Sequence, residues 1–311
     1  MNKESLRSAF ADTILKKAQS DKEIIVVCSD SRGSGLVTDF ANELPSQFVE
    51  IGIAEQNAVT VSGGLASIGK KVYTVGPASF YSMRSAEQIK VDLAYSKNNV
   101  KIIGISGGIS YGALGSTHHS LQDYALMRAI PDLLVLSPSD SNQMKSLVDE
   151  LLLTTVPAYV RIGREAVPVI YPEDIKIKIG KAIKWFDGKD IGIIASGQMV
   201  HRAIEAAELL KKDNISATVL DMFTIKPLDK ETIIELAKSC GCILTVEEHS
   251  IYGGLGSAVS EVVVENYPVP MKIIGFTDDD IPNGSDTEVF ESFGMDANGI
   301  VMTAKTLISK R

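Results

Sequence analysis

EIIVVCSD, at residues 23–30, decides the fold class, because it is a short run of β-branched and apolar residues that ends in polar ones. Seven more runs of this kind follow, separated by segments with the apolar spacing of helices. Continuous apolar strands that alternate with helices are typical of a parallel sheet covered on both faces. The further runs are KKVYTVG (70–76), NVKIIGIS (99–106), LLVLSPS (133–139), DIGIIASG (190–197), ATVLDMF (217–223), CILTVEE (242–248) and MKIIGF (271–276).

The runs fall into two series, which predicts an α/β protein of two domains, each a mostly parallel sheet flanked by helices. We expect the domains at residues 1–170 and 188–311. Between them, residues 171–187 contain Pro172 and the alternating stretch KIKIGKAIKW, which indicates a linker with some strand. Helices are expected at about 54–68, 83–96, 120–129, 140–153, 200–212, 229–238 and 254–265.

Composition excludes several classes of function. The net charge of -8 and the lack of a cluster of Lys and Arg argue against nucleic-acid binding, which needs such clusters to neutralise phosphates. No apolar run reaches the ~18 residues of a membrane span. The three cysteines lack the spacing of a disulfide framework, which indicates a reducing compartment. We therefore expect a cytoplasmic protein that does not bind a membrane.

Open α/β sheets bind ligands at the carboxyl ends of their strands. In the first predicted domain, the segments at these ends are rich in Gly, Ser and His. A site built from them is the first hypothesis for function, and it includes Ser34 as a candidate for substrate binding. The segments are SDSRGSG (29–35), VGPASFYSMR (75–84), SGGISYGALGSTHHS (106–120) and SPSD (137–140).

Glu55 is the clearest candidate residue, since it lies in FVEIGIAEQNAVTVSGGLAS (48–67), a segment otherwise rich in apolar and small residues. A carboxylate is costly to bury. It could accept backbone N–H groups in the first turn of the helix that begins near Ala54, where a carboxylate is favoured. The small flanking residues also allow a bulky ligand to approach it closely.

Other candidates follow the strands. His118 lies in a glycine-rich loop, and its neighbour His119 lacks the Cys and carboxylate companions of a metal site, so we expect no metal ligands on this chain. Either Phe80 or Tyr81 could stack on a flat heterocycle, although both residues, with Arg84, also fit the start of an ordinary helix.

Arg161 and Arg164, in YVRIGREAVP, can recognise a phosphate or a carboxylate by paired hydrogen bonds. Two arginines three residues apart also occur on solvated edges. The sequence of this segment leaves both interpretations open.

Taken together, several stretches resemble the C-terminal part of a thiamine-diphosphate-dependent transketolase, that is, its pyrimidine-binding domain followed by its C-terminal domain. The chain is also similar to 1-deoxyxylulose-5-phosphate synthase and, more distantly, to the β subunits of 2-oxoacid dehydrogenases. The stretches are EIGIAEQNAV (50–59), FYSMRSAEQ (80–88), GSTHHSLQDYALMRAIPDLLVLSPSD (115–140), TVEEHSIYGGLGS (245–257) and ESFGMDANGIV (291–301).

The resemblance implies roles for the candidate residues. The glutamate of the family's AEQ motif hydrogen-bonds the aminopyrimidine ring of thiamine diphosphate and promotes loss of the thiazolium proton, and it corresponds to Glu55. The stacking aromatic falls on Tyr81, with Phe80 as the neighbouring choice, and Arg84 joins the cofactor-binding set. The substrate-side histidine falls on His118. The phosphate-binding arginine falls on Arg164, with Arg161 close by.

The resemblance also implies a partner. Full-length members bind the diphosphate and a divalent metal through a Gly-Asp-Gly motif in an N-terminal domain, and no GDG occurs in these 311 residues. We therefore expect a split enzyme that binds a sugar phosphate, in which an N-terminal-type subunit holds Mg and the diphosphate. Because the family places the cofactor between protomers, self-association into a heterotetramer of two plus two chains is the simplest arrangement.

The sugar side departs from the family pattern at two positions. Many transketolases have an Asp where this chain has Leu114, and a His where it has Ser106. These differences leave the sugars open. Two alternatives to a transketolase remain: a 2-oxoacid dehydrogenase β subunit, and a non-catalytic interaction subunit with the same fold.

Overall fold

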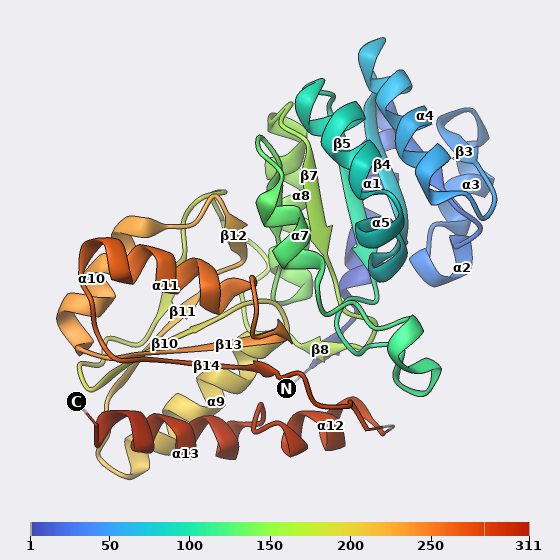
Figure 1. The fold of residues 1–311 in the computed structure, drawn as a ribbon. Coiled ribbons are helices and arrows are strands. Elements are labelled where there is room, and N and C mark those ends of the chain that lie inside the picture. The colour runs from blue at the N-terminus through green and yellow to red at the C-terminus, as the bar shows by residue number, and fades with distance from the viewer. Residues whose placement is uncertain (1, 283, 311) are drawn as a thin grey trace.

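The first half of the chain builds six strands of a seven-stranded sheet with the order β12-β6-β7-β5-β4-β2-β3, and the edge strand β12 comes from the second half. The second half also builds a five-stranded sheet with the order β14-β13-β10-β11-β9 (Figure 1). The structure is a computed structural model that describes residues 2–282 and 284–310. Pairing in each sheet is parallel except at one edge, where β12 and β9 run antiparallel to their neighbours. A third, two-stranded sheet joins β1 to β8. The prediction of two α/β sheets is confirmed.

The strands are β1 Lys3–Glu4, β2 Ile24–Cys28, β3 Phe48–Glu50, β4 Lys71–Pro77, β5 Val100–Ile105, β6 Leu134–Leu136, β7 Ala158–Arg161, β8 Val167–Pro168, β9 Ile183–Trp185, β10 Ile191–Ala195, β11 Ala217–Asp221, β12 Thr224–Lys226, β13 Ile243–Ser250 and β14 Met271–Phe276.

The α-helices are α1 Leu6–Ser20, α2 Arg32–Gly35, α3 Thr38–Glu43, α4 Glu55–Ser67, α5 Ala78–Arg84, α6 Ala86–Gln88, α7 Asp123–Ala129, α8 Ser141–Leu153, α9 Met199–Lys212, α10 Lys230–Cys240, α11 Leu255–Asn266, α12 Asp286–Ser292 and α13 Ala297–Ile308. Two 3-10 helices, η1 Pro45–Gln47 and η3 Gly112–Thr117, and a π-helix, η2 Ile89–Tyr95, complete the set.

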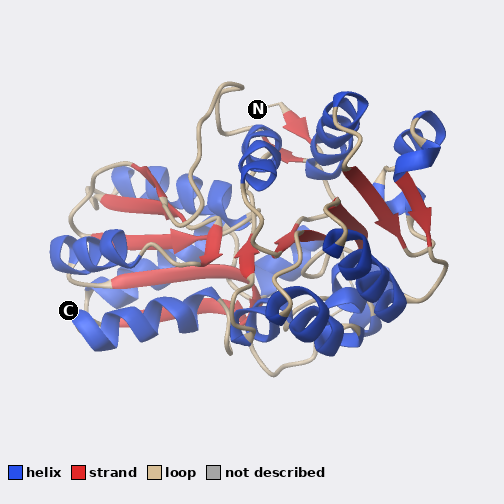
Figure 2. Ribbon diagram, turned by 90° about the horizontal axis from the view of Figure 1, so that it is seen from above, coloured by secondary structure: helices blue, strands red, loops and turns tan. Residues whose placement is uncertain are grey.

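Helices cover both faces of each sheet, as the continuous apolar strands predict. Alternation along β2 sends Ile24 and Val26 toward α1 and α8, and Ile25 and Val27 toward α4, α5 and α7. In the second half, α10 and α11 lie on one face of the sheet and α9 and α13 on the other (Figure 1). Figure 2 shows the two sheets from above, each between its helices.

Three local expectations differ from the structure. Residues 83–96 do not form one helix, because Ser85 leaves the helical region at φ -107° and ψ 16°, and η2 follows α6. The run 217–223 ends as a strand at Asp221, and β12 then crosses to pair with β6 of the first sheet. The strand β7 was not predicted, yet it lies between β5 and β6 inside the sheet.

Within the described ranges, we find no helix that combines the length and the apolar character needed to cross a membrane.

Candidate functional site

Glu55 is placed by a short turn between β3 and α4. The carboxylate of Glu50, the last residue of β3, accepts hydrogen bonds from the backbone N–H of Asp30 at 2.8 Å and of Gly52 at 3.1 Å. Gly52 adopts φ +74°, which favours glycine. This turn sets Glu55 as the first residue of α4, where its side chain is only 6% exposed. The sequence hypothesis of a buried carboxylate at a helix start therefore matches the geometry.

Arg84, at the end of α5, is the partner of Glu55. Its Nη1 donates to both carboxylate oxygens, at 3.2 Å each. The same guanidinium lies over the ring of Phe80, with its central carbon 4.1 Å from the ring centroid. Ile53 and Gln56 also line the open pocket around Glu55 and Arg84. The guanidinium of Arg84, a flat group that carries N–H donors, thus contacts both Phe80 and Glu55.

His118 follows the 3-10 helix η3 and also contacts Phe80. The ring centroids of Phe80 and His118 are 5.2 Å apart in an edge-to-face arrangement. The ring centroid of Tyr111 lies 5.3 Å from that of His118, also edge to face. The Oγ1 of Thr117 is 2.9 Å from His118 Nδ1. His118 is therefore held by two aromatic rings and by a hydroxyl that can fix its tautomer.

Arg164 extends the site beyond Tyr111, since its guanidinium lies 5.3 Å from the centroid of that ring. Arg7, from α1, donates to the backbone oxygens of Ser34 at 2.7 Å and of Arg164 at 2.8 Å. Burial, and then the positive charge of Arg164, lowers the pKa of Arg7. The Nε of Arg7 is buried and has no hydrogen-bond partner among the described residues. Arg7 as a whole is only partly buried, and two adjacent guanidinium groups are suited to an anion.

Sequence reasoning missed Arg7 and Tyr111. Arg7 lies on a helix remote in sequence from the other candidates, and only the α1 start beside β2 brings it to Ser34. Tyr111 was visible in the glycine-rich loop, but nothing in its local pattern distinguished it from a packing residue.

Two predicted residues do not face this site. Tyr81 has no exposed surface, and its hydroxyl donates to Ser29 Oγ at 3.0 Å. Its ring packs so closely on Gly76 that a Cβ there would lie 2.4 Å from it. The assignment of the stacking ring to Tyr81 therefore fails for this conformation, and Phe80, the neighbouring choice, has its ring in the site.

Arg161 is also corrected, because it lies on the interior strand β7 and is 3% exposed. Its Nη2 donates to the backbone oxygen of Glu248 at 2.6 Å and lies 3.5 Å from the Glu248 carboxylate, while its Nε lies 3.6 Å from Asp123. Burial opposes the charge of Arg161, but the two carboxylates and nearby tyrosines raise its pKa overall. Its ion pairs hold the two halves of the chain together and leave it inaccessible to a substrate.

The two positions that depart from the family pattern differ in exposure. Leu114 is 55% exposed on η3, whereas Ser106 is fully buried at φ +55°, with no partner for its hydroxyl among the described residues.

Burial lowers the pKa of His119. Among the described residues, no group of three or more His, Cys, Asp or Glu side chains could hold a metal ion.

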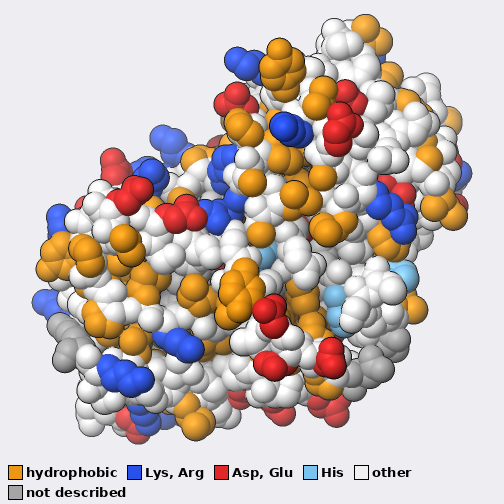
Figure 3. Space-filling model, viewed as in Figure 1, with side chains coloured by type: hydrophobic (Ala, Val, Ile, Leu, Met, Phe, Trp, Pro, Cys, Tyr) orange, Lys and Arg blue, Asp and Glu red, His pale blue; other side chains and the backbone are white. Residues whose placement is uncertain are grey.

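The face of the molecule seen in Figure 1 is mixed in charge. Figure 3 shows Lys and Arg side chains interspersed with Asp and Glu on the face of Figure 1, together with exposed His side chains. Ile53, two residues before Glu55, is 77% exposed, and Met83, directly before Arg84, is 59% exposed.

Two known domain families match the chain. Transketolase pyrimidine-binding domains match residues 2–169, and transketolase C-terminal domains match residues 180–300. The chain belongs to the transketolase family. Members of this family are transferases that use thiamine diphosphate.

Two relatives and one solved structure are similar to this chain over nearly its whole length. It is 51% identical over 305 residues to an apulose-4-phosphate transketolase subunit of Phocaeicola vulgatus, covering 98% of this chain and 97% of the relative. It is 35% identical to 6-deoxy-6-sulfo-D-fructose transketolase subunit SqwH of Clostridium sp., covering 98% and 95%. The solved structure is described as split gene transketolase, inactive beta4 tetramer, and it matches with a TM-score of 0.91 at 35% identity over 98% of each chain.

Transketolases made as one chain are longer. This chain is 33% identical to the transketolase of Rattus norvegicus, and the match covers 99% of this chain but 50% of the relative. Its match to subunits of split transketolase-type enzymes thus extends over nearly the whole of those relatives, whereas it spans half of the rat transketolase.

Proposed function

We propose that this chain, together with a separate subunit, transfers a two-carbon ketol unit from a ketose phosphate to an aldose with thiamine diphosphate as cofactor. One observation carries the proposal. Glu55, Arg84, Phe80 and His118 form a continuous row of contacts, and Tyr111 continues that row to Arg164. One end of the row is suited to a flat nitrogen heterocycle and the other end to an anion.

The heterocycle end fits the aminopyrimidine of thiamine diphosphate. The guanidinium of Arg84 shows that a planar group with N–H donors can lie against Phe80 and bind both oxygens of Glu55. When bound, thiamine diphosphate supplies the carbon nucleophile that carries the two-carbon unit. Glu55 would hold the proton shared with the ring nitrogen, and burial strengthens that hydrogen bond by excluding water. Phe80 would fix the plane of the ring.

The anion end would orient the substrate. His118 lies between the proposed cofactor ring and the two arginines, so its free ring nitrogen can bind a substrate oxygen. Arg164 and Arg7 would hold the phosphate of the sugar with charge-assisted hydrogen bonds. The relative from Phocaeicola vulgatus makes apulose 4-phosphate the first donor to assay, beside xylulose 5-phosphate.

The proposed partner supplies the rest of the site. No GDG motif occurs in this sequence, and the match with the Phocaeicola vulgatus subunit covers 97% of that relative. We propose that the partner holds the diphosphate and Mg, and that two copies of each chain form the active enzyme. The exposed Ile53, which lines the pocket, and the exposed Met83, which precedes Arg84 on α5, fit such a contact.

The test is ketol transfer by this chain mixed with a chain from the same organism that carries the Gly-Asp-Gly motif. We expect E55Q to lower kcat by roughly 10²- to 10⁴-fold, the range for loss of a proton-transfer residue. E87Q, which removes an exposed carboxylate from α6, serves as the control. Full activity of E55Q would contradict the proposal. Turnover of a 2-oxoacid with a lipoyl acceptor, without ketol transfer, would assign the chain to the dehydrogenases instead.

A further inference from the structure

The loop that carries His118, residues 107–121, is closed at its base. Gly108 and Ser120 pair across the loop, with Gly108 N–H donating to Ser120 O at 3.1 Å and Ser120 N–H donating to Gly108 O at 2.8 Å. Between them lie η3 and His118, whose N–H donates to Gly115 O at 3.0 Å. A shift of the base would therefore move the whole loop.

Both sides of this base are held by the end of β13, which belongs to the second half of the chain. Glu248 Oε1 accepts a hydrogen bond from Ile109 N–H at 2.9 Å. Two residues later, Ser250 N–H donates to Leu121 O at 2.9 Å. The loop is thus fixed by one side chain and one backbone group of the same strand.

Glu248 is itself held from several sides. Its Oε2 accepts a hydrogen bond from Gln198 Nε2 at 2.6 Å, and its carboxylate lies 3.5 Å from Arg161 Nη2. It is 7% exposed. A Cβ at Gly108 would lie 1.9 Å from Glu248 Oε1, so the carboxylate packs directly on the backbone of the loop base. A side chain held this firmly can define the position of what it binds.

We propose that Glu248 is a positioning residue, through which the second half of the chain sets the place of His118 by holding Ile109. The inference rests on the proposed function, since it assigns His118 to the substrate. Glu248 touches neither the proposed cofactor ring nor the proposed phosphate position. Its effect on the reaction passes through the loop.

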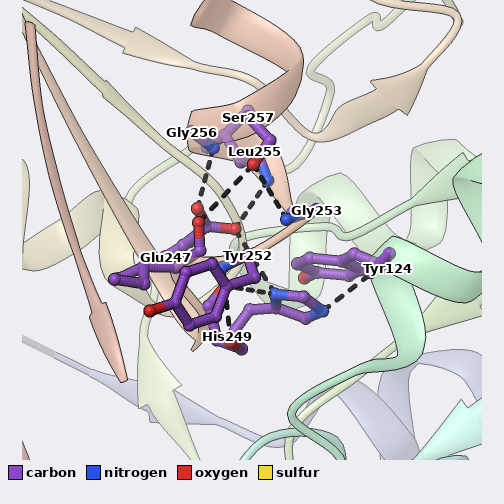
Figure 4. Close-up of polar contacts among 12 residues, drawn as sticks. Tyr124, Glu247, His249, Tyr252, Gly253, Leu255, Gly256 and Ser257 are labelled. Atoms are coloured by element: carbon purple, nitrogen blue, oxygen red, sulfur yellow. Dashed lines mark hydrogen bonds and ion pairs between the residues drawn. The ribbon is translucent and has the colours of Figure 1, made fainter. Parts of the chain in front are cut away.

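The neighbouring residue provides a matched control. Glu247 is also buried, at 0% exposed, but accepts hydrogen bonds from the backbone N–H of Leu255 at 2.6 Å and of Gly256 at 2.7 Å, at the start of α11 (Figure 4). In Figure 4 these bonds point toward α11, away from Tyr124. E247Q therefore disturbs the same strand without releasing Ile109.

The first readout does not need activity. Hydrogen exchange of the 107–121 segment, measured by mass spectrometry on the complex with its partner, should speed up about ten- to hundredfold in E248Q. The amide has one acceptor oxygen where the carboxylate has two, so it cannot accept from both Ile109 N–H and Gln198 Nε2. The E247Q variant should leave this segment unchanged. Equal exchange of the segment in both variants would overturn the proposal.

The second readout is a double-mutant cycle. We expect E248Q to lower kcat/KM for the sugar phosphate by roughly tenfold to a hundredfold, with thiamine diphosphate affinity unchanged. In the H118A background the same substitution should cost nothing more, because the residue that it positions is absent. An equal loss in both backgrounds would show a general structural role and would contradict the inference.

If E248Q does not fold, Q198A removes one donor to Glu248 and should give the same effects in smaller size. Failure of the proposed function would give a different result. The wild-type complex would then transfer no ketol unit, although hydrogen exchange of residues 107–121 would still speed up in E248Q.

Discussion

Arg84 Nη1 lies 3.2 Å from each carboxylate oxygen of Glu55, and the guanidinium stacks on Phe80. The side chain of Glu55 is 6% exposed and that of Arg84 is 51% exposed. Arg84 thus reaches in from solvent to neutralise a buried carboxylate, in the position that we propose for the aminopyrimidine ring. A half-exposed ion pair is worth about 1 kcal/mol or less, so Arg84 can be displaced at small cost.

Removing this competitor should favour the cofactor. We expect R84A to bind thiamine diphosphate about three- to fivefold more tightly in the reconstituted complex, because the cofactor no longer has to break an ion pair. Calorimetric titration measures this, with K90A as an exposed control on η2. Weaker binding by R84A would show instead that Arg84 contacts the bound cofactor.

Phe80 and Tyr81 offer a matched pair of substitutions. F80A should weaken thiamine diphosphate binding by about tenfold, since an aromatic contact of roughly 0.5–1.5 kcal/mol is lost together with buried area. Y81F removes only a buried hydroxyl that donates to Ser29. It should leave cofactor affinity unchanged and lower the free energy of unfolding by about 1 kcal/mol. Unchanged binding by F80A would contradict the assignment of the stacking ring to Phe80, and weaker binding by Y81F would show that the Tyr81 hydroxyl contributes to the cofactor site.

Arg164 and Arg7 can be tested by comparing a phosphorylated sugar with its unphosphorylated form. R164A and R7A should each raise KM for a sugar phosphate about ten- to hundredfold, with little effect on the unphosphorylated sugar, because a charge-assisted hydrogen bond to phosphate is lost.

R161A should behave differently from these two variants. It should destabilise the chain by roughly 3–5 kcal/mol, because Asp123 and Glu248 lose a buried partner. A raised KM for the sugar phosphate alone in R161A, with no loss of stability, would contradict this assignment.

His249 predicts a dependence of stability on pH. It is fully buried and stacks on Tyr124 with ring centroids 5.1 Å apart (Figure 4). Burial outweighs the nearby Asp123 carboxylate, and with Arg161 it lowers the pKa of His249 from 6.5 to about 4. Between these two values the unfolded chain binds more protons, so the contribution of His249 is complete above pH 6.5 and is lost as the pH falls.

At pH 5 this loss amounts to about 2 kcal/mol for His249. The difference in free energy of unfolding between wild type and H249Q should therefore shrink by about that amount from pH 7 to pH 5. Urea unfolding at several pH values measures it. A difference that stays constant over this range would contradict the assignment.

The sequence predicts the strands and helices well where periodicity is strong. The run EIIVVCSD became β2, and the helix expected at 140–153 is α8, capped by Asp140 as its side chain accepts from Gln143 N–H. The strand β12 could not be predicted, because its pairing with β6 depends on contact between the two halves and three residues carry no period.

The site was only partly predictable for the same reason. Glu55 and His118 stand out locally, as a carboxylate in an apolar segment and a histidine in a glycine-rich loop. Burial separates Phe80 from Tyr81 and Arg164 from Arg161, and burial depends on which strand lies inside the sheet. Local pattern could not show that β7 is such a strand, so Arg161 looked as accessible as Arg164.

The most direct test of the account is a titration of thiamine diphosphate with Mg present, first on this chain alone and then on its mixture with the Gly-Asp-Gly chain. We predict tight binding only in the mixture, because we assign Glu55 and Phe80 of this chain to the ring and the diphosphate and metal site to the partner. Equally tight binding to the isolated chain would contradict the shared site. Absence of binding in both cases would contradict the assignment of Glu55 to the cofactor.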